Sequence, residues 1–176
     1  MKNYLFQSDR LGFRTWTEGD LDAFHAINSD PEVMYFFQKT FSKQESLEKM
    51  KTMNSNFEKD GFCYFAVDHL DTGELAGTLG MGRKTFTSNF TPCVDIGWRF
   101  KKTYWNQGLA TEGALACIDF ARKIGLKKLY SYASKANTAS TRVMQKIGMD
   151  YLEDFNHSEL ENYTRLQPFS VYQIKL

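Results

Sequence analysis

The chain has 176 residues, of which 42% are hydrophobic and 24% are charged, and its formal net charge is +1. These values are ordinary for a globular protein and exclude an intrinsically disordered chain and a coiled coil. The length corresponds to about one domain, so we expect residues 1–176 to form a single domain. Because 22 Lys and Arg balance 21 Asp and Glu, neither a nucleic acid nor a membrane is expected as a partner.

The apolar runs and the cysteines narrow the class further. No apolar run approaches the ~20 residues of a membrane span, and the N-terminus lacks the apolar stretch of a signal peptide. We therefore expect a cytoplasmic protein. The three cysteines are widely spaced without a C-x-x-C pair, and only three histidines accompany them. This pattern argues against a disulfide scaffold and a structural zinc site, so no metal is expected.

The first third of the chain predicts one strand and two helices. Residues 10–16 alternate in the manner of a strand, and Thr17 to Asp20 has the capping-box spacing that starts a helix. Asp30-Pro31 should end that helix. A second capping box, Ser42 to Glu45, precedes apolar residues at helical spacing and predicts a second helix.

Strands and helices alternate in the remainder of the chain. A turn at 71–74 joins strands at 62–70 and 75–83 into an antiparallel hairpin, and another strand is predicted at 94–100. Residues 108–124 predict a long helix that is largely buried, because apolar side chains cover much of its circumference. The remaining elements are a strand at 128–134, a helix at 138–147 and closing strands at 149–155 and 170–174.

The segment from Trp98 to Glu112 runs from a strand through a polar loop into the long helix. Gly108 stands at the mouth of that helix, where unpaired N–H groups and the positive end of the helix dipole suit a phosphate. The stretch Gln107 to Thr111 is therefore a candidate anion cradle. ATP and dinucleotide binding lose support, because G-x-x-x-x-G-K-[ST] and G-x-G-x-x-G are both absent. A tight turn into a buried helix would also explain Gly108.

A second motif supplies context for the first. Asn137 is placed to cap a helix that Gly148 ends. Together the two segments resemble the GCN5-related N-acetyltransferase (GNAT) superfamily, whose acetyl-coenzyme A signature is a [QR]-x-x-G-x-[GA] loop at a helix start followed by N-x-x-[SA]. Residues 9–14, 30–34, 95–98 and 105–112 look like the ribosomal-protein N-terminal (Rim-type) branch. The resemblance covers nearly the whole chain.

This resemblance implies an α/β (α+β) fold with a mixed, mostly antiparallel central sheet, helices on both faces and a splayed pair of parallel strands. It implies acetyl-coenzyme A (acetyl-CoA) as cosubstrate, attacked directly at its thioester by a primary amine. The acceptor would be a protein or peptide N-terminus or a small-molecule amine. Dimers are common in this branch, which allows a homodimer, but the sequence itself is silent on this point.

The resemblance also implies which residues contact the cosubstrate. The pyrophosphate would be bound by backbone N–H groups of Gln107, Gly108, Leu109, Ala110 and Thr111. The strand end Trp98, Arg99 and Phe100 would pair its free backbone groups with the pantetheine amides. Asn137 and Ser140 map to the pantetheine and thioester side.

Three departures from the family pattern bear on the chemistry. Trp105 occupies the usual Gln or Arg position, and Met149 replaces the usual Phe. Met144 stands where many members carry the Tyr that protonates the departing thiolate. Ser140 and Tyr132 are then the remaining candidates for this acid, unless solvent suffices.

Asp95 is our candidate for the general base. It lies near the strand position at which related enzymes carry a Glu, and a carboxylate there could take the proton of the attacking ammonium, directly or through water. A short Asp on an antiparallel strand could instead be exposed and without a catalytic role. Since the acid and base are both open, a noncatalytic CoA-binding or regulatory GNAT-like protein is the alternative to an N-acetyltransferase.

Overall fold

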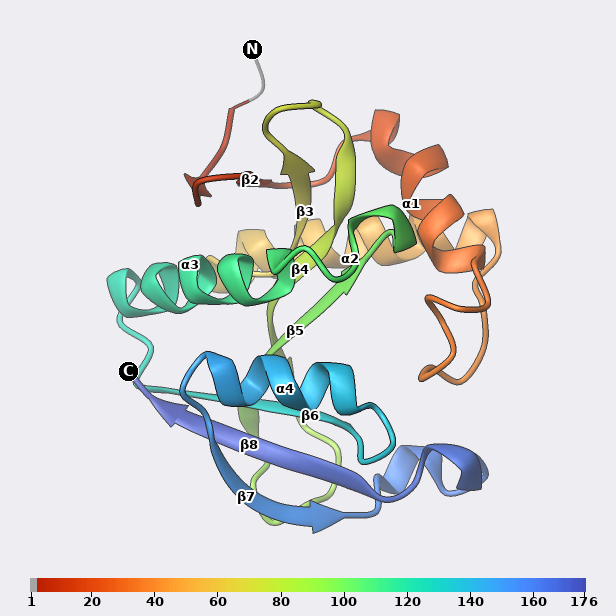
Figure 1. Cartoon of the computed structure of the whole chain (residues 1–176), viewed down its shortest axis with the longest axis vertical. Helices are drawn as coiled ribbons and strands as arrows, with labels where there is room; N and C mark the ends of the chain where they lie inside the picture. The colour runs from red at the N-terminus through yellow and green to blue at the C-terminus, as the bar shows by residue number, and fades with distance from the viewer. Residues whose placement is uncertain (1–2) are drawn as a thin grey trace.

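In the computed structural model, which describes residues 3–176, an eight-stranded sheet has the order β1-β2-β3-β4-β5-β6-β8-β7 (Figure 1). The strands are β1 (Phe6–Gln7), β2 (Leu11–Arg14), β3 (Tyr64–His69), β4 (Leu75–Lys84), β5 (Cys93–Phe100), β6 (Lys128–Ser134), β7 (Asp150–Phe155) and β8 (Phe169–Lys175). The helices are α1 (Leu21–Ser29), α2 (Lys43–Asp60), α3 (Leu109–Lys123) and α4 (Thr138–Lys146). Only β5 and β6 pair in parallel within this sheet of residues 3–176. The predicted fold class is confirmed.

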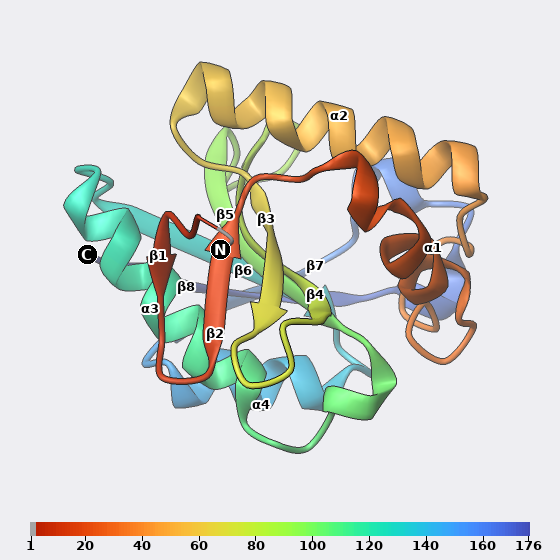
Figure 2. The same ribbon diagram turned by 90° about the horizontal axis from the view of Figure 1, so that it is seen from above.

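The helices lie on both faces of the sheet. Figure 2 shows α2 on one side and α3 and α4 on the other. Successive side chains of β5 point to opposite faces, as strand geometry requires. Ile96 and Phe100 enter the core that includes α3, whereas Arg99 reaches Phe24 of α1 on the opposite face. We call these two sides the α3 face and the α1 face.

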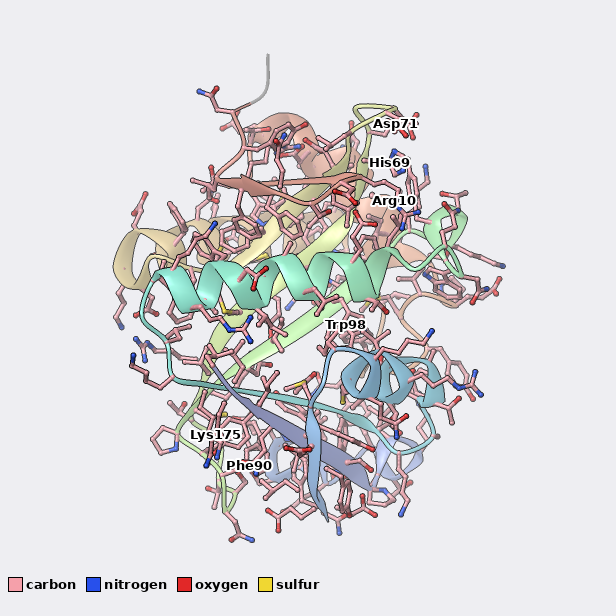
Figure 3. The ribbon with its side chains drawn as sticks, turned by 60° about the vertical axis from the view of Figure 1, so that its left-hand side comes forward. Arg10, His69, Asp71, Phe90, Trp98 and Lys175 are labelled. Atoms are coloured by element: carbon pink, nitrogen blue, oxygen red, sulfur yellow. The ribbon has the colours of Figure 1, made fainter. Side chains whose placement is uncertain are left out.

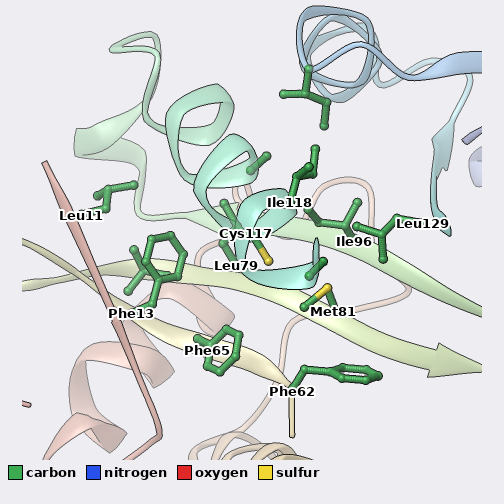
Figure 4. Packing of buried hydrophobic residues seen from close by; sticks show 14 of the residues in the cluster. Leu11, Phe13, Phe62, Phe65, Leu79, Met81, Ile96, Cys117, Ile118 and Leu129 are labelled. Carbon is green, nitrogen blue, oxygen red and sulfur yellow. The ribbon is translucent and has the colours of Figure 1, made fainter. Parts of the chain in front are cut away.

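Two of the three hydrophobic clusters among residues 3–176 hold the helices against the sheet. The larger core, on the α3 face, packs Leu79, Ile96 and Ile118 together with Cys117, all at most 1% exposed (Figure 4). The smaller core joins α1 and α2 to the sheet through side chains that include Trp16, Phe24, Ile27, Met50 and Ala66. Each fully buried large apolar side chain contributes about 1.5–3 kcal/mol relative to an exposed one.

The local signals for the first two helices are confirmed. The carboxylate of Asp20 accepts a 2.8 Å hydrogen bond from the backbone N–H of Thr17, and a short 3₁₀ turn (Glu18–Asp20) leads into α1. Ser42 and Glu45 form a complete capping box at the start of α2. The strand β1, only two residues long, carried no pattern from which it could be predicted.

The expectation that the long helix is largely buried is wrong for one of its faces. Leu115 and Ile124 are 45% and 40% exposed. Small side chains concentrate on the other face and allow α3 to approach the sheet closely. At Gly113, an added Cβ would lie only 2.9 Å from a methyl group of Leu79. This close packing fixes the position of the N-terminus of α3 over the sheet.

The parallel strands β5 and β6 pair at one point only, Asp95 opposite Tyr130. Beyond it the strands diverge, as Figure 1 shows, while β5 stays paired with β4 and β6 with β8. The end of β5 therefore leaves one of its edges without a neighbouring strand. This is the predicted splayed pair.

Within residues 3–176, no helix combines the length and the apolar character needed to cross a bilayer.

Candidate active site

The loop before α3 presents a row of free backbone donors. Asn106 and Gly108 both have a positive φ, 58° and 78°, which turns the chain sharply into the helix. The first backbone bond of α3 runs from the N–H of Glu112 to the carbonyl of Gly108 at 3.0 Å. Among residues 3–176, the N–H groups from Gln107 to Thr111 have no hydrogen-bond partner. Five adjacent donors at a helix N-terminus form a site suited to an anion.

Glu112 anchors this loop to the start of the chain. Its carboxylate accepts hydrogen bonds from the Ser8 hydroxyl at 2.7 Å and from the backbone N–H and Nε of Arg10 at 2.8 and 2.7 Å. Partial burial by itself would raise the pKa of Glu112, but the hydrogen bonds from Ser8 and Arg10 lower it below the usual value. Glu112 is therefore a structural anchor rather than a base.

Arg10 is a residue of this loop region that the sequence did not single out. Its Nη2 donates to the carbonyl of Gln107 at 3.1 Å, and the same atom would lie 3.8 Å from a Cβ at Gly108. Figure 3 shows Arg10 near the beginning of α3. The guanidinium is ion-paired with Glu112 at 2.6 Å, so it adds hydrogen-bond donors beside the five free amides rather than an uncompensated charge. Only its position within the family-like segment 9–14 could have indicated it.

Fewer backbone groups at the end of β5 are free for a ligand than the sequence predicted. The N–H of Lys101 bonds to the carbonyl of Ala76 on β4, and Thr78 is the register partner of Arg99. In an antiparallel ladder this places the backbone groups of Arg99 on β4 and those of Trp98 and Phe100 on the open side. The backbone groups of Arg99 are therefore engaged with β4, and its side chain lies on the α1 face.

Trp98 carries the available backbone groups at this edge. The carbonyl of Phe100 accepts a 2.9 Å hydrogen bond from the indole Nε1 of Trp105, whereas no strand pairs with Trp98 on its open side. Trp98 lies between α3 and α4 (Figure 3). The indole of Trp105 thus closes part of the edge, which gives a structural role to this departure from the family pattern.

The start of α4 carries the second predicted group of contacts. The side-chain oxygen of Asn137 accepts the N–H of Ser140 at 3.2 Å and caps the helix. Within residues 3–176, the NH₂ group of Asn137 and the hydroxyl of Ser140 have no partner, so both can meet a ligand. Met144 is 1% exposed and packs in the core, so it has no contact with an open site.

Asp95 lies on the α1 face and is 6% exposed rather than solvated. Both of its oxygens are 2.7 Å from the Tyr64 hydroxyl, and Nζ of Lys84 is 3.6 Å away. Burial raises the pKa of Asp95, although the Lys84 charge and the Tyr64 hydrogen bond act in the opposite direction. Burial also raises the pKa of Tyr64 well above its ordinary value, so this hydroxyl is the donor.

Glycines make room for the Tyr64 ring across the sheet. An added Cβ at Gly82 would lie 2.9 Å from the ring, and one at Gly97 would lie 3.2 Å from it. The sequence reasoning missed both Tyr64 and Lys84 as neighbours of Asp95. The glycines within β4 and β5 were the available signal, because a strand glycine often marks a close approach.

The predicted catalytic residues do not all share one face. Tyr132 lies on the α1 face with Asp95, because Tyr130, two residues before it, is the register partner of Asp95. Its ring packs 5.5 Å from Phe86 and 5.7 Å from His157, and burial raises the pKa of its hydroxyl. Ser140 starts from α4, on the opposite side of the sheet.

The description "Acetyltransferase (GNAT) domain" belongs to a family model that matches residues 10–150. The chain belongs to the GNAT acetyltransferase family. The predicted superfamily and enzyme class are thereby confirmed. Among curated relatives, YkkB of Bacillus subtilis is 28% identical over 148 residues, covering 82% of this chain and 84% of YkkB.

Solved structures of GNAT proteins have the same fold as this chain. A GNAT acetyltransferase from Bacillus anthracis has a TM-score of 0.77 and 24% identity, covering 97% of each chain. RimL, a ribosomal L7/L12 alpha-N-protein acetyltransferase in complex with coenzyme A, has a TM-score of 0.77 and 15% identity, covering 96% of each chain. At these identities the likeness concerns the fold.

Proposed function

We propose that residues 1–176 form a single N-acetyltransferase domain, which transfers the acetyl group of acetyl-CoA to a primary amine on a protein or peptide N-terminus or a small molecule. One observation carries this proposal. Five free amides at the start of α3 lie beside a strand end whose Trp98 backbone has no partner. The amides suit a pyrophosphate, and the free strand edge suits an extended chain that contains amide groups.

Free polar groups of the chain are available for each part of acetyl-CoA in this proposal. Gln107 to Thr111, with Arg10 beside them, would hold the pyrophosphate, and Trp98 and Asn137 would hold the pantetheine amides. The fold neighbour RimL is in complex with coenzyme A, which supports this assignment. When bound, acetyl-CoA supplies the activated acyl group.

Asp95 and Tyr132 are the groups that we propose for proton transfer. An ammonium must lose a proton before its nitrogen can attack, and the Asp95 carboxylate can accept that proton directly, through water or through Tyr64. The raised pKa of Tyr132 keeps its hydroxyl protonated at neutral pH, as an acid for the departing thiolate requires. Ser140, whose hydroxyl is also free, is the second candidate for this acid.

The two ends of α3 offer a matched test of the cradle. Gly108 and Gly125 have positive φ angles of 78° and 84°, so a side chain strains the backbone equally at both. Gly108→Trp should weaken CoA binding by about tenfold or more, because the indole occupies the cradle. Gly125→Trp should leave the dissociation constant unchanged. Isothermal titration with CoA measures both, and equal constants for the two variants would refute the assigned cradle.

The alternative, a noncatalytic CoA-binding or regulatory protein, is favoured by one observation: Asp95 is buried, with both oxygens beside Tyr64. Release of free CoA thiol in the presence of amine acceptors distinguishes the two functions. The enzyme proposal expects turnover that Asp95→Asn reduces about 100-fold or more, with CoA affinity retained. Thermal stabilisation by acetyl-CoA without any turnover would support the alternative.

The finer assignment to the Rim-type branch is also our proposal. It is supported by the segments at 9–14, 95–98 and 105–112 and by fold similarity to RimL. Acetylation of the N-terminus of a ribosomal-protein peptide would support it, and acetylation of small amines alone would contradict it. A homodimer, common in the branch, would appear in the solution mass of the CoA-bound protein. A cytoplasmic location is proposed on the sequence reasoning given above.

A further inference from the structure

Arg99 lies on the α1 face under the segment that connects α1 to α2. Its guanidinium carbon is 5.6 Å from the ring centre of Phe24 and 5.0 Å from that of Phe37. Its Nη1 lies 3.3 Å from the sulfur of Met34, a weak acceptor. Its Nε is buried without a hydrogen-bond partner. The guanidinium is thus surrounded by aromatic and sulfur groups, and part of the residue remains accessible.

No carboxylate of residues 3–176 lies within 4 Å of the Arg99 guanidinium. Burial lowers the pKa of Arg99 to about 10. A desolvated cation without a counter-ion is costly, and contacts with aromatic rings offset only part of that cost. Arginine is also the side chain best suited to bind a carboxylate or phosphate in two parallel hydrogen bonds.

Lys49 of α2 adds a second cation. Its Nζ lies 4.2 Å from the ring centre of Phe41, and no carboxylate of residues 3–176 is within 4 Å of it. Burial lowers the pKa of Lys49 and the charge of Arg99 lowers it further, whereas the charge of Glu45 acts in the opposite direction. Lys84 also contributes, but it is paired with Asp95. Arg99 and Lys49 are therefore two partly desolvated cations, neither of which has a carboxylate within 4 Å among residues 3–176.

This cluster belongs to the acceptor side of the proposed site. Arg99 follows Trp98, the strand residue with free backbone groups, and lies four residues beyond Asp95 on the same face. At ~3.3 Å per residue, the Cα atoms of Asp95 and Arg99 are about 13 Å apart. Arg165 supports the segment above the cluster by donating to the carbonyls of Tyr35 and Phe37. Arg99 therefore shares with the proposed base, Asp95, one face of β5.

We propose that the acceptor is an amine that carries an anionic group, a carboxylate or a phosphate, and that Arg99 and Lys49 bind this group. The proposal rests on the N-acetyltransferase function proposed above and defines its substrate class. It disfavours polyamines, which would bring further positive charge to two unpaired cations. It also gives the Arg99 side chain a role that the cosubstrate contacts predicted for it do not include.

Matched pairs of acceptors test this specificity. Glycine, serine, methionine and phenylalanine are each compared with the corresponding amino acid amide, and phosphoethanolamine with ethanolamine, by acetyl-CoA-dependent thiol release. For at least one pair, wild-type kcat/KM should favour the anionic member by about tenfold or more. Arg99→Met should abolish most of that preference and Lys49→Met a smaller part. Arg122→Met, at an exposed residue of α3 paired with Asp119, is the control and should retain it.

A preference within the amino acid pairs indicates recognition of a carboxylate, and a preference for phosphoethanolamine over ethanolamine indicates recognition of a phosphate. The proposal is overturned if wild type uses neutral members as well as anionic ones, or if Arg99→Met keeps the preference. Isothermal titration of the same compounds without acetyl-CoA separates failure of this proposal from failure of the function. If turnover is absent with every acceptor, the transferase function fails. If an acid binds and its amide does not, and Arg99→Met abolishes that binding, anion recognition by Arg99 is established even without turnover. If no acid binds, anion recognition is refuted.

Discussion

Two arginines of the same sheet differ in whether carboxylates surround their guanidinium groups. Arg14 of β2 is 6% exposed and donates to both oxygens of Asp20, each at 2.7 Å, and to both oxygens of Asp68 at 2.7 and 2.8 Å. Burial by itself would lower the pKa of Arg14, but its hydrogen bonds with these carboxylates raise it. Arg99 of β5 has no carboxylate partner within residues 3–176, and burial lowers its pKa.

The difference teaches how burial of a charge indicates its role. The charge of Arg14 is fully compensated inside the protein, so this arginine serves the fold. The charge of Arg99 is left for something outside the chain to compensate. Both side chains belong to the same sheet. What separates a structural arginine from a binding one is therefore the number of carboxylates around the guanidinium, rather than how deeply it is buried.

The largest effect is expected from removing the structural arginine. Arg14→Met leaves Asp68, which is fully buried, and Asp20 without their shared cation. We expect the free energy of unfolding to fall by about 3–5 kcal/mol, the usual cost of uncompensated buried charge. Urea denaturation at pH 7 measures this change.

The same substitution at the second arginine is the control. Arg99→Met keeps an apolar side chain against Phe24 and Phe37 and removes an unpaired cation. The free energy of unfolding should therefore stay within about 1 kcal/mol of wild type or rise. A loss as large as that of Arg14→Met would show that Arg99 is structural and would remove the contrast between the two.

A smaller effect, with opposite signs in the two regions, should appear in the pH dependence of stability. Burial by itself would raise the pKa of Asp20, but the Arg14 hydrogen bond and the other contacts lower it overall. Asp20 thus stabilises the fold above its unfolded pKa, about 3.9, and this contribution is lost as the pH falls through the folded value. The pKa of Asp95 is raised by burial, so wild type loses stability as the pH rises from about 3.9 through the folded value.

Asp20→Asn and Asp95→Asn separate these contributions when unfolding is followed by urea denaturation between about pH 2.5 and 7. The stability difference between wild type and Asp20→Asn should shrink toward low pH. Relative to wild type, Asp95→Asn should become more stable as the pH rises. If the stability difference from wild type changed with pH in the same direction for both variants, the surroundings assigned to these two carboxylates would be wrong.

Much of the fold could be predicted because its signals are local. The capping boxes at Thr17 and Ser42 mark helix starts whichever tertiary contacts follow, since their hydrogen bonds join residues that are three apart in the sequence. The anion cradle could be predicted for the same reason: a positive-φ glycine and the free amides of one helix turn are contiguous in sequence. The strand β1 could not, because two residues contain no period.

The sequence by itself determined the elements, the cradle at Gln107 to Thr111 and the family resemblance, since each depends on residues close along the chain. Only the tertiary structure decided what surrounds each side chain. The contact of Tyr64 and Lys84 with Asp95 and the missing counter-ion of Arg99 depend on the register of β3, β4 and β5 and on how α1 and α2 pack against them. The register of a strand is set by which of its faces is buried. Which charged groups of the acceptor side are paired therefore follows only from the assembled sheet.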